Sequence, residues 1–314
     1  MIFKFPEQLM FIKNGKAIQK HSDESMDGKL CVVSGATSGV GYEAVKALAA
    51  GGTNIVMVVR NENKAKAVKE EIERKYSVSV DYFIADFSDL KQVEKAALEI
   101  LDKYPRIDVL VNSVGIHSTK RILNKDGFEM AFCVNHLSTF LLTKLLLKRM
   151  AESSPSRIIQ VNSEGHRFSG LKLNDLNWNK RIYTGLRSYG SSKTAQLLTV
   201  WQFAEDLEGT GVTINAMHPG GVRTNIGNNN GRLYRWFLHH VTWHFLDDPK
   251  ISGEALYYLA SAKELRKVSG KFFNLTTVEK PAKHALDPKK QKKIWDLSME
   301  MTGLVKKDVG CNEI

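Results

Sequence analysis

Short apolar segments alternate with helical patterns over most of this 314-residue chain, from Leu30 to Met217. These segments are continuous apolar runs, which indicates strands that are buried on both faces. Such strands, when separated by helices, form a parallel sheet with helices packed on either side. The expected strands cover residues 30–34, 54–59, 80–85, 107–112, 157–162, 212–217 and 271–275.

Right-handed crossovers turn this pattern into a Rossmann-type doubly wound parallel sheet of about seven strands, in three α/β/α layers. A long helix is expected over about 128–151, and another runs through Tyr189 to about Leu207. No linker rich in Pro, Ser or Gly and no repeat divides the chain, so we expect a single domain. Its predicted parts are an N-terminal arm at 1–27, a body at 28–304 and a polar tail at 305–314.

The formal net charge is +11, and residues 280–307 carry eight lysines against three acids. A basic face can attract anionic lipid, nucleic acid or a phosphorylated cofactor, but no nucleic-acid motif accompanies it, and a solvated surface is the favoured interpretation.

The three cysteines show no disulfide framework or metal spacing, which favours a reducing, cytoplasmic compartment over secretion. His239, His240 and His244 lack the partner carboxylate or cysteine spacing of a metal site, so no metal is expected.

Two apolar stretches raise the question of membrane contact. Residues 1–20 mix apolar side chains with lysines, but the run Leu9–Ile12 is too short for a signal peptide or a spanning helix. These residues could lie in a membrane interface, giving peripheral association, or pack on the body as a terminal arm. Met130–Thr143 is the longest stretch without a charged residue, and its polar side chains favour a buried core helix.

The first expected strand runs into Ser34–Gly41, which is followed by a helix. Its glycines fall as GxxxGxG, and small residues there let the backbone approach a pyrophosphate at the helix N-terminus. The predicted cofactor contacts of this loop are Gly35, Thr37, Ser38, Gly39, Val40 and Gly41. The absence of Gly-Lys-Ser/Thr excludes a P-loop, and a glycine-rich turn without a ligand is the alternative.

Arg60 and Asn61 follow the second expected strand, where NAD-binding proteins often place a carboxylate against the ribose hydroxyls. A carboxylate would repel a 2′-phosphate, whereas an arginine can bind it through charge-assisted hydrogen bonds. The sequence therefore predicts NADP(H) rather than NAD, with a plain surface cation as the alternative role of Arg60.

Tyr189 and Lys193 are four residues apart on one expected helix, so their side chains share a face. A phenol titrates near pH 10, and a neighbouring ammonium favours the phenolate and lowers the phenol's pKa. The pair could then exchange a proton with a substrate oxygen, although such a pair also occurs by chance on helix surfaces.

Five segments in this order together resemble the short-chain dehydrogenase/reductase family: Ser34–Gly41, Asn112–Gly115, Asn135, Ser163 and Tyr189–Lys193. Within that family, residues 134–143, 155–159, 218–224 and 269–273 resemble the retinol-dehydrogenase-like group. The resemblance extends from about residue 28 to about residue 304. Val114 departs from the family pattern, because it puts bulk where a small residue is usual.

The resemblance implies a role for each matching residue. Tyr189 would pass the proton, Lys193 would depress its pKa and hold the nicotinamide ribose, and Ser163 would bond the substrate oxygen. Asn135 would hold a water that links Lys193 to solvent. Further cofactor contacts would come from Asp86, Phe87, Asn112, Val114, Gly115, Pro219, Gly220, Val222 and Thr224.

Several other residues near these positions need an interpretation. Ser188, Ser191 and Ser192 lie on the tyrosine helix, where we assign them to its surface. His166 lies close to Ser163 and invites a hydrolase interpretation, which the lack of a GxSxG turn disfavours.

The segment 227–250 falls where the family places its substrate lid, and it carries five aromatic residues within 233–246. These aromatics could line an apolar pocket, contact a membrane or form an ordinary packed helix.

The sequence thus predicts an NADP(H)-dependent oxidoreductase that reduces a carbonyl or oxidises the matching alcohol of a lipophilic substrate, such as a retinoid, steroid or long-chain aldehyde. Three alternatives stay open: a catalytically silent NADP-binding sensor or scaffold, a membrane-surface module, and a ring double-bond reductase of the protochlorophyllide reductase type. The last of these has a long insertion before its tyrosine, and this chain lacks it. The oligomeric state is left open.

Overall fold

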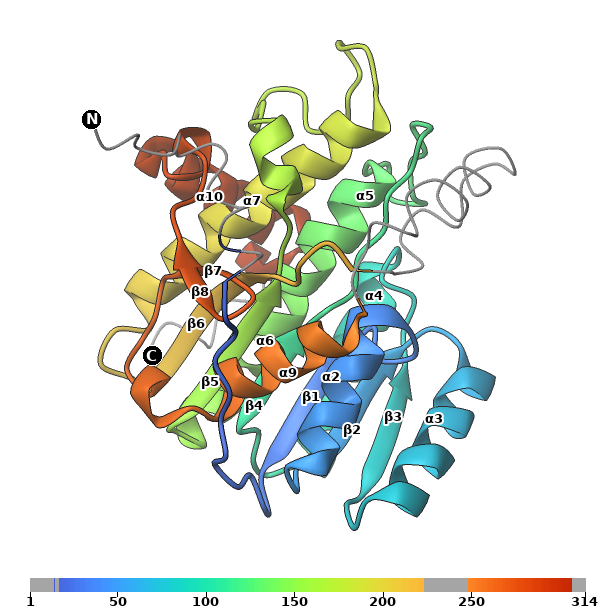
Figure 1. The fold of residues 1–314 in the computed structure, drawn as a ribbon. Coiled ribbons are helices and arrows are strands. Elements are labelled where there is room, and N and C mark those ends of the chain that lie inside the picture. The colour runs from blue at the N-terminus through green and yellow to red at the C-terminus, as the bar shows by residue number, and fades with distance from the viewer. Residues whose placement is uncertain (1–13, 15–16, 223–247, 307–314) are drawn as a thin grey trace, which may run out of the picture.

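The computed structural model describes residue 14, residues 17–222 and residues 248–306. These residues form one eight-stranded sheet in the order β3-β2-β1-β4-β5-β6-β7-β8 (Figure 1). The strands are β1 Leu30–Ser34, β2 Asn54–Val59, β3 Val80–Ile84, β4 Val109–Asn112, β5 Ser156–Val161, β6 Val212–His218, β7 Phe272–Asn274 and β8 Thr277–Glu279. The first seven are parallel, which confirms the doubly wound sheet.

The count of about seven strands misses β8, which pairs antiparallel with β7 at the edge of the sheet. This strand has three residues and follows a tight connection in which Leu275 has a φ of 53°. Three residues are too few to show any hydrophobic period, so a sequence pattern has no means of detecting such a strand.

Helices cover both faces of the sheet (Figure 1). Helices α2, α3 and α9 belong with one buried core, and helices α4, α6, α7 and α10 with the other. Trp295 on α10 packs against Phe140 of α6 and Phe203 of α7, with ring centroids 5.1 and 4.7 Å apart, so α10 lies outside those two helices. The bounds are α2 Gly39–Ala50, α3 Glu62–Lys75, α4 Leu90–Lys103, α6 Ser138–Glu152, α7 Gly185–Asp206, α9 Lys250–Ser261 and α10 Pro288–Met301.

The long helix expected over about 128–151 is interrupted. It starts as α5 Met130–Phe132, passes through a π-helical turn at Cys133–Leu137 and continues as α6. Taken together, Met130–Glu152 is long and apolar enough to cross a membrane, yet most of it is buried inside the protein. This burial confirms the prediction of a core helix for Met130–Thr143.

The described part of the N-terminal arm starts beside β7 and β8 and continues along α9, where the Tyr257 hydroxyl donates to the Glu24 carbonyl. The Asn14 side-chain amide donates to Glu279 over 2.8 Å, and the Lys20 backbone N–H donates to the Thr276 hydroxyl over 2.9 Å. Residues 1–13, most of the expected lid (through residue 247) and residues 307–314 lie outside the described residues. The interpretations that rest on residues 1–20, on 233–246 and on His239, His240 and His244 therefore stay predictions.

Candidate active site

The connection from β1 to α2 needs glycine at two positions. Gly35 has a φ of +70°, and a Cβ there would lie 2.9 Å from the Cα of Val114. A Cβ at Gly41 would lie 2.4 Å from the carbonyl oxygen of Gly35. The loop therefore folds back tightly on itself and against the backbone after β4, which can approach this closely because residue 35 is glycine.

The N-cap residue of α2, Ser38, makes no side-chain cap hydrogen bond, a property that α2 shares with α6 and α9. In α3, α4, α7 and α10, by contrast, a side chain accepts a hydrogen bond from the first turn. Because the first amide groups of α2 have no side-chain acceptor and carry the positive end of the helix dipole, they fit a pyrophosphate. The predicted contacts Thr37, Gly39 and Val40 belong to this same turn.

The ends of the next two strands carry further predicted cofactor contacts. Arg60 is exposed at the end of β2 and forms no ion pair with a described residue. Asn61 caps α3, since its side chain accepts from the Lys64 N–H over 2.9 Å. Asp86 accepts from the Ser88 N–H over 2.8 Å, and Phe87 beside it is buried. Neither residue directly after β2 is a carboxylate, and Glu62 at the start of α3 pairs with Lys66 over 2.9 Å, so the end of β2 suits a phosphate better than a bare ribose.

The residues after β4 extend from the core to the catalytic centre. Asn112 is buried and donates from its amide to the Thr143 hydroxyl over 2.8 Å, while its side-chain oxygen has no hydrogen-bond partner in the described part of the chain. A Cβ at Gly115 would lie 3.6 Å from the Asn135 side-chain oxygen and 3.8 Å from Lys193 Nζ. The structure thus places Gly115 directly beside two of the predicted catalytic residues.

Ser163 and Tyr189 meet at the carboxyl end of β5. Ser163 caps the 3-10 helix Glu164–Phe168, and its Oγ accepts from the Gly165 N–H over 3.0 Å. The Tyr189 ring lies so close to Gly165 that a Cβ there would be 2.7 Å from the Tyr189 Cε1. Desolvation raises the pKa of Tyr189, and a side-chain hydrogen bond with Ser163 acts in the opposite direction.

Lys193 is buried beside the tyrosine. Its Nζ donates to the Val161 carbonyl over 3.1 Å and to the Gln196 side-chain oxygen over 2.9 Å, and it lies 5.8 Å from the Tyr189 ring centroid. Burial lowers the pKa of Lys193 to about 7. The expected lowering of the Tyr189 pKa is not seen in this geometry, because burial disfavours the charged forms of both side chains.

Asn135 lies in the π turn, where its side chain is completely engaged. Its amide donates to the Ile116 carbonyl over 3.0 Å and to the Ser192 hydroxyl over 2.9 Å, and its side-chain oxygen accepts from the Ile116 N–H over 2.8 Å. Its backbone carbonyl accepts from the Gln196 amide. The structure therefore brings Asn135 into the same polar network as Lys193, and the implied water contact stays a prediction.

Sequence reasoning missed two members of the site. Gln196 bridges Lys193 and Asn135, and it follows Tyr189 by seven residues, so the helical spacing that paired Tyr189 with Lys193 could have found it. His117 stacks edge-on against the Tyr189 ring with centroids 5.8 Å apart, and burial lowers its pKa. The only signal for His117 was its place two residues after Gly115.

The assignment of the three α7 serines to the helix surface is wrong. Ser188, Ser191 and Ser192 are all buried, because the π turn, α10 and the 3-10 helix after Ser163 pack on α7. Ser192 donates to the Tyr189 carbonyl over 2.8 Å and accepts from Asn135, so it belongs to the polar network.

His166 is not placed to act as a base on Ser163. Its Nδ1 lies 2.8 Å from the Ser163 backbone carbonyl, and its Nε2 accepts from the Ala282 N–H over 3.1 Å. Both ring nitrogens are occupied, and burial lowers the pKa of His166 to about 4. The geometry therefore contradicts a hydrolase dyad and shows a neutral histidine that fixes the backbone after β5.

The loop after β6 is described as far as residue 222. The Ser252 hydroxyl donates to the Pro219 carbonyl over 2.6 Å, Gly220 has a φ of +85°, and Val222 is buried. Thr224 lies outside the described residues. Among the residues that the structure describes, no group of three His, Cys, Asp or Glu side chains is placed to hold a metal ion.

Comparisons with known proteins identify the family. A family model described as short chain dehydrogenase matches residues 29–233. Human retinol dehydrogenase 13 is 35% identical over 288 residues, which cover 90% of this chain and 87% of that protein. This chain belongs to the short-chain dehydrogenase family. Human retinol dehydrogenase 14 is also 35% identical, with 90% of this short-chain dehydrogenase and 88% of the relative covered.

Solved structures agree with the fold of this short-chain dehydrogenase. An uncharacterised protein from Mycobacterium paratuberculosis matches with a TM-score of 0.73 and 28% identity, over 91% of this chain and 98% of that chain. A short-chain dehydrogenase from Shigella flexneri, solved in complex with NADP, matches with a TM-score of 0.65 and 21% identity. The match covers 81% of this chain and 99% of that chain. The chain is thus an oxidoreductase of a family that uses nicotinamide cofactors, and it resembles the retinol dehydrogenases.

Proposed function

We propose that this enzyme transfers a hydride between NADP(H) and the carbonyl or alcohol carbon of a lipophilic substrate, with Tyr189 as the acid–base residue. The observation that carries the proposal is one continuous polar network at the carboxyl end of β5. Tyr189 and Lys193 lie on α7, whereas Ser163 follows β5 and Asn135 lies in the π turn, yet hydrogen bonds and close contacts join all four. Buried polar groups joined in this way are held in fixed positions.

Each side chain has a distinct part in the proposed reaction. The cofactor supplies or accepts the hydride when bound. In the reductive direction, negative charge grows on the substrate oxygen, and the Ser163 and Tyr189 hydroxyls are placed together to stabilise it and to donate the proton. Lys193 can gain or lose a proton near neutral pH because burial lowers its pKa to about 7. When charged, it favours the phenolate that Tyr189 leaves behind.

The proposed preference for NADP(H) rests on the end of β2. Arg60 is an exposed arginine without an ion-pair partner among the described residues, and Asn61 beside it is committed to capping α3. The uncapped N-terminus of α2 and the glycine loop would hold the pyrophosphate. This arrangement supports a cofactor that carries an additional phosphate on its ribose.

The proposed substrate class rests on the retinol dehydrogenase relatives and on the aromatic residues at 233–246. Retinoids, steroid ketones and long-chain aldehydes share an apolar body and one oxygen function. The body at 28–304, a cytoplasmic location and peripheral membrane contact through residues 1–20 or 233–246 also remain proposals.

The decisive experiment measures NADPH consumption with retinal, a steroid ketone and a long-chain aldehyde, comparing the parent enzyme with Tyr189→Phe. Loss of the acid–base hydroxyl should lower kcat by about 10²- to 10⁴-fold while NADPH binding changes little. Tyr104→Phe is the matched control, since that hydroxyl bonds Asp81 beside β3, outside the network. Unchanged turnover in Tyr189→Phe would overturn the proposal. NADPH binding without turnover of any substrate would favour the silent sensor instead.

A further inference from the structure

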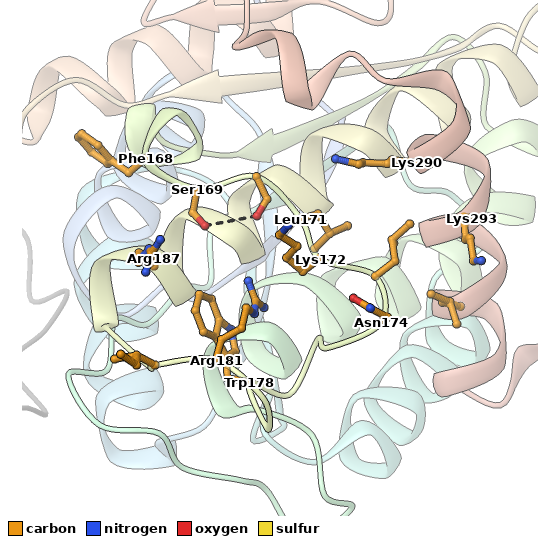
Figure 2. Close-up of a pocket in the computed structure, with 14 residues that line it drawn as sticks. Phe168, Ser169, Leu171, Lys172, Asn174, Trp178, Arg181, Arg187, Lys290 and Lys293 are labelled. Carbon is orange, nitrogen blue, oxygen red and sulfur yellow. Dashed lines mark hydrogen bonds between the residues drawn. The ribbon is translucent and has the colours of Figure 1, made fainter.

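A groove of about 920 Å³ lies on the side of α7 that faces away from the catalytic network. The chain from Phe168 to Asn174 and the start of α7 form one wall, and α10 forms the other (Figure 2). None of Ser163, Tyr189 and Lys193 lines it. Its volume is in the range of cavities that bind small molecules, so it is a second site to consider.

The wall of this groove between Leu173 and Ile182 is held in a fixed conformation. Asp175 is buried and accepts from the Asn179 N–H over 2.7 Å and from the Arg181 Nε over 3.0 Å. The Arg181 guanidinium lies 3.7 Å from the ring centroid of Trp178, which has a φ of 57°. A tryptophan in this left-handed conformation costs about 1–2 kcal/mol, so the hydrogen bonds of Asp175 must offset that cost. The wall is therefore organised before any ligand arrives.

The lining combines apolar side chains with positive charge. Leu171, Leu173, Trp178 and Leu297 provide apolar surface, and Phe168 and Ile182 stand at the rim, 60% and 83% exposed. Among the described residues, five basic side chains and no aspartate or glutamate line the same groove: Lys172, Arg181, Arg187, Lys290 and Lys293. Of these only Arg181 has an ion-pair partner among the described residues. An apolar surface beside uncompensated cations is complementary to a molecule that has both an apolar body and an anionic head.

We propose that this groove binds an anionic amphiphile, with one apolar chain on the leucine-lined surface and a carboxylate or phosphate head at Lys290 and Lys293. Figure 2 shows these two lysines projecting from α10 on one side of the groove, opposite Phe168 and Arg187. A neighbouring groove on α10 shares Lys293 and Leu297, but it adds Asp296 and Glu300 together with Lys289 and Lys292, so the excess of positive charge belongs to the first groove. The site is separate from the catalytic network, and Arg187 lies on the same helix two residues before Tyr189.

The test is displacement of a fluorescent probe, 11-(dansylamino)undecanoic acid, from the full chain. Dodecanoate, dodecyl phosphate and the uncharged dodecanol serve as competitors, each below its critical micelle concentration. Both anions should displace the probe. Dodecanol should require an at least about tenfold higher concentration for half-displacement, because it has no negative charge to pair with the lysines. Displacement by only one anion would also support the site and would identify its head group.

Lys290→Glu/Lys293→Glu should weaken probe binding by about tenfold or more, as each lysine becomes a repelling carboxylate. Lys91→Glu/Lys267→Glu is the matched control, because it changes the net charge equally at two exposed lysines outside the groove. Leu297→Trp should also weaken binding by filling the groove while leaving its charges intact. NADPH affinity should stay unchanged in all three variants.

Any of three results would overturn the proposal. The first is that Lys290→Glu/Lys293→Glu binds the probe as tightly as the parent, and the second is that the Lys91→Glu/Lys267→Glu control loses as much probe affinity as the groove variant. The third is that dodecanol displaces the probe at the same concentration as dodecanoate. Binding only to vesicles of anionic phospholipid, with no binding of monomeric probe, would also overturn it and would indicate a membrane-contact face instead.

Discussion

The two sides of α7 differ in how far the cationic side chains there are exposed to solvent. On one side, Lys193 is 3% exposed, and Val161 and Gln196 accept hydrogen bonds from its ammonium group. On the other side, Arg187 and the α10 lysines stand in an open groove without ion pairs to described residues. Helix α7 thus has a buried, hydrogen-bonded cation on one side and solvent-accessible cations, its own Arg187 and those of α10, on the other.

This difference determines how each side responds to change. A buried charge interacts strongly with its neighbours and is screened little by salt, so single substitutions have large effects. Exposed cations act through a field that salt weakens within about 8–10 Å. Substitutions in the network should therefore have large effects that do not depend on salt. Substitutions of exposed cations should have smaller effects that weaken as salt is added. The four predictions below test this contrast, from the largest effect to the smallest.

Lys193→Met should reduce kcat/KM by about 10²- to 10⁴-fold, the usual range for loss of acid–base assistance. It should also change how stability depends on pH. Since burial lowers the pKa of Lys193 from 10.5 to about 7, the unfolded chain binds a proton between these values that the folded chain does not.

Stability of the parent should therefore rise with pH across this window, and Lys193→Met should lack that rise. Relative to the variant, the parent's free energy of unfolding should increase by about 1–3 kcal/mol from pH 7 to pH 9. Urea unfolding at several pH values measures this difference. Lys267→Met, at an exposed lysine, should behave like the parent. Parallel pH curves for the parent and Lys193→Met would show that Lys193 is not held in a desolvated site.

Gln196→Leu should lower kcat by about 10- to 100-fold, because losing a hydrogen bond to a charged group costs about 1.5–3 kcal/mol. Gln202→Leu is the control on the same helix, where the amide bonds exposed Asp206. Steady-state kinetics at low and high salt should give the same ratio between Gln196→Leu and the parent. A loss that vanishes in high salt would mean that the network is open to solvent.

Arg60→Asp should weaken NADPH binding by about tenfold or more and leave NADH binding nearly unchanged, since a carboxylate repels a 2′-phosphate. Titration of each cofactor against the parent, Arg60→Asp and the exposed α3 control Arg74→Asp measures this. Because Arg60 is exposed, its effect should shrink as salt is added. Equal use of NADH and NADPH by the parent would contradict the interpretation of Arg60.

Probe binding in the groove should weaken by roughly threefold to tenfold between 50 and 500 mM salt, because its cations face water. Over the same range, kcat of the parent with saturating cofactor should change by less than about twofold. Fluorescence titration and steady-state kinetics on one preparation give both values. A groove affinity that is indifferent to salt would remove the distinction between the two sides of α7.

Most of the fold could be predicted because it depends on patterns that sequence displays. Buried parallel strands are continuous apolar runs, and Tyr189 with Lys193 follows the four-residue helical spacing. The π turn could not be predicted, since Cys133–Leu137 has the composition of an ordinary core helix. Helical spacing places Gln196 on the face of Tyr189, but its hydrogen bond to Asn135 depends on how the π turn packs on α7, and the contact of His117 depends on how the chain after β4 turns toward Tyr189.

The burial of Ser188, Ser191 and Ser192 shows a further limit. Their side chains would suit a solvated helix face, but the π turn, α10 and the Glu164–Phe168 turn pack on α7 and exclude water from them. The type of a side chain indicates whether it can lie in water or in the core. Whether it is buried depends on which helices and strands pack together.

The π turn at Cys133–Leu137 makes the number of residues in this segment as important as their identity. Successive residues of an α-helix advance by about 100°, and a π turn accommodates one extra residue without breaking the helix. Deleting a single residue here would let α5 and α6 join as one regular helix and would keep its backbone hydrogen bonds. It would also rotate everything before the deletion by about a quarter turn relative to α6. A one-residue deletion in this segment should therefore abolish activity in a chain that still folds, whereas conservative substitutions of Cys133 or Val134 should be tolerated.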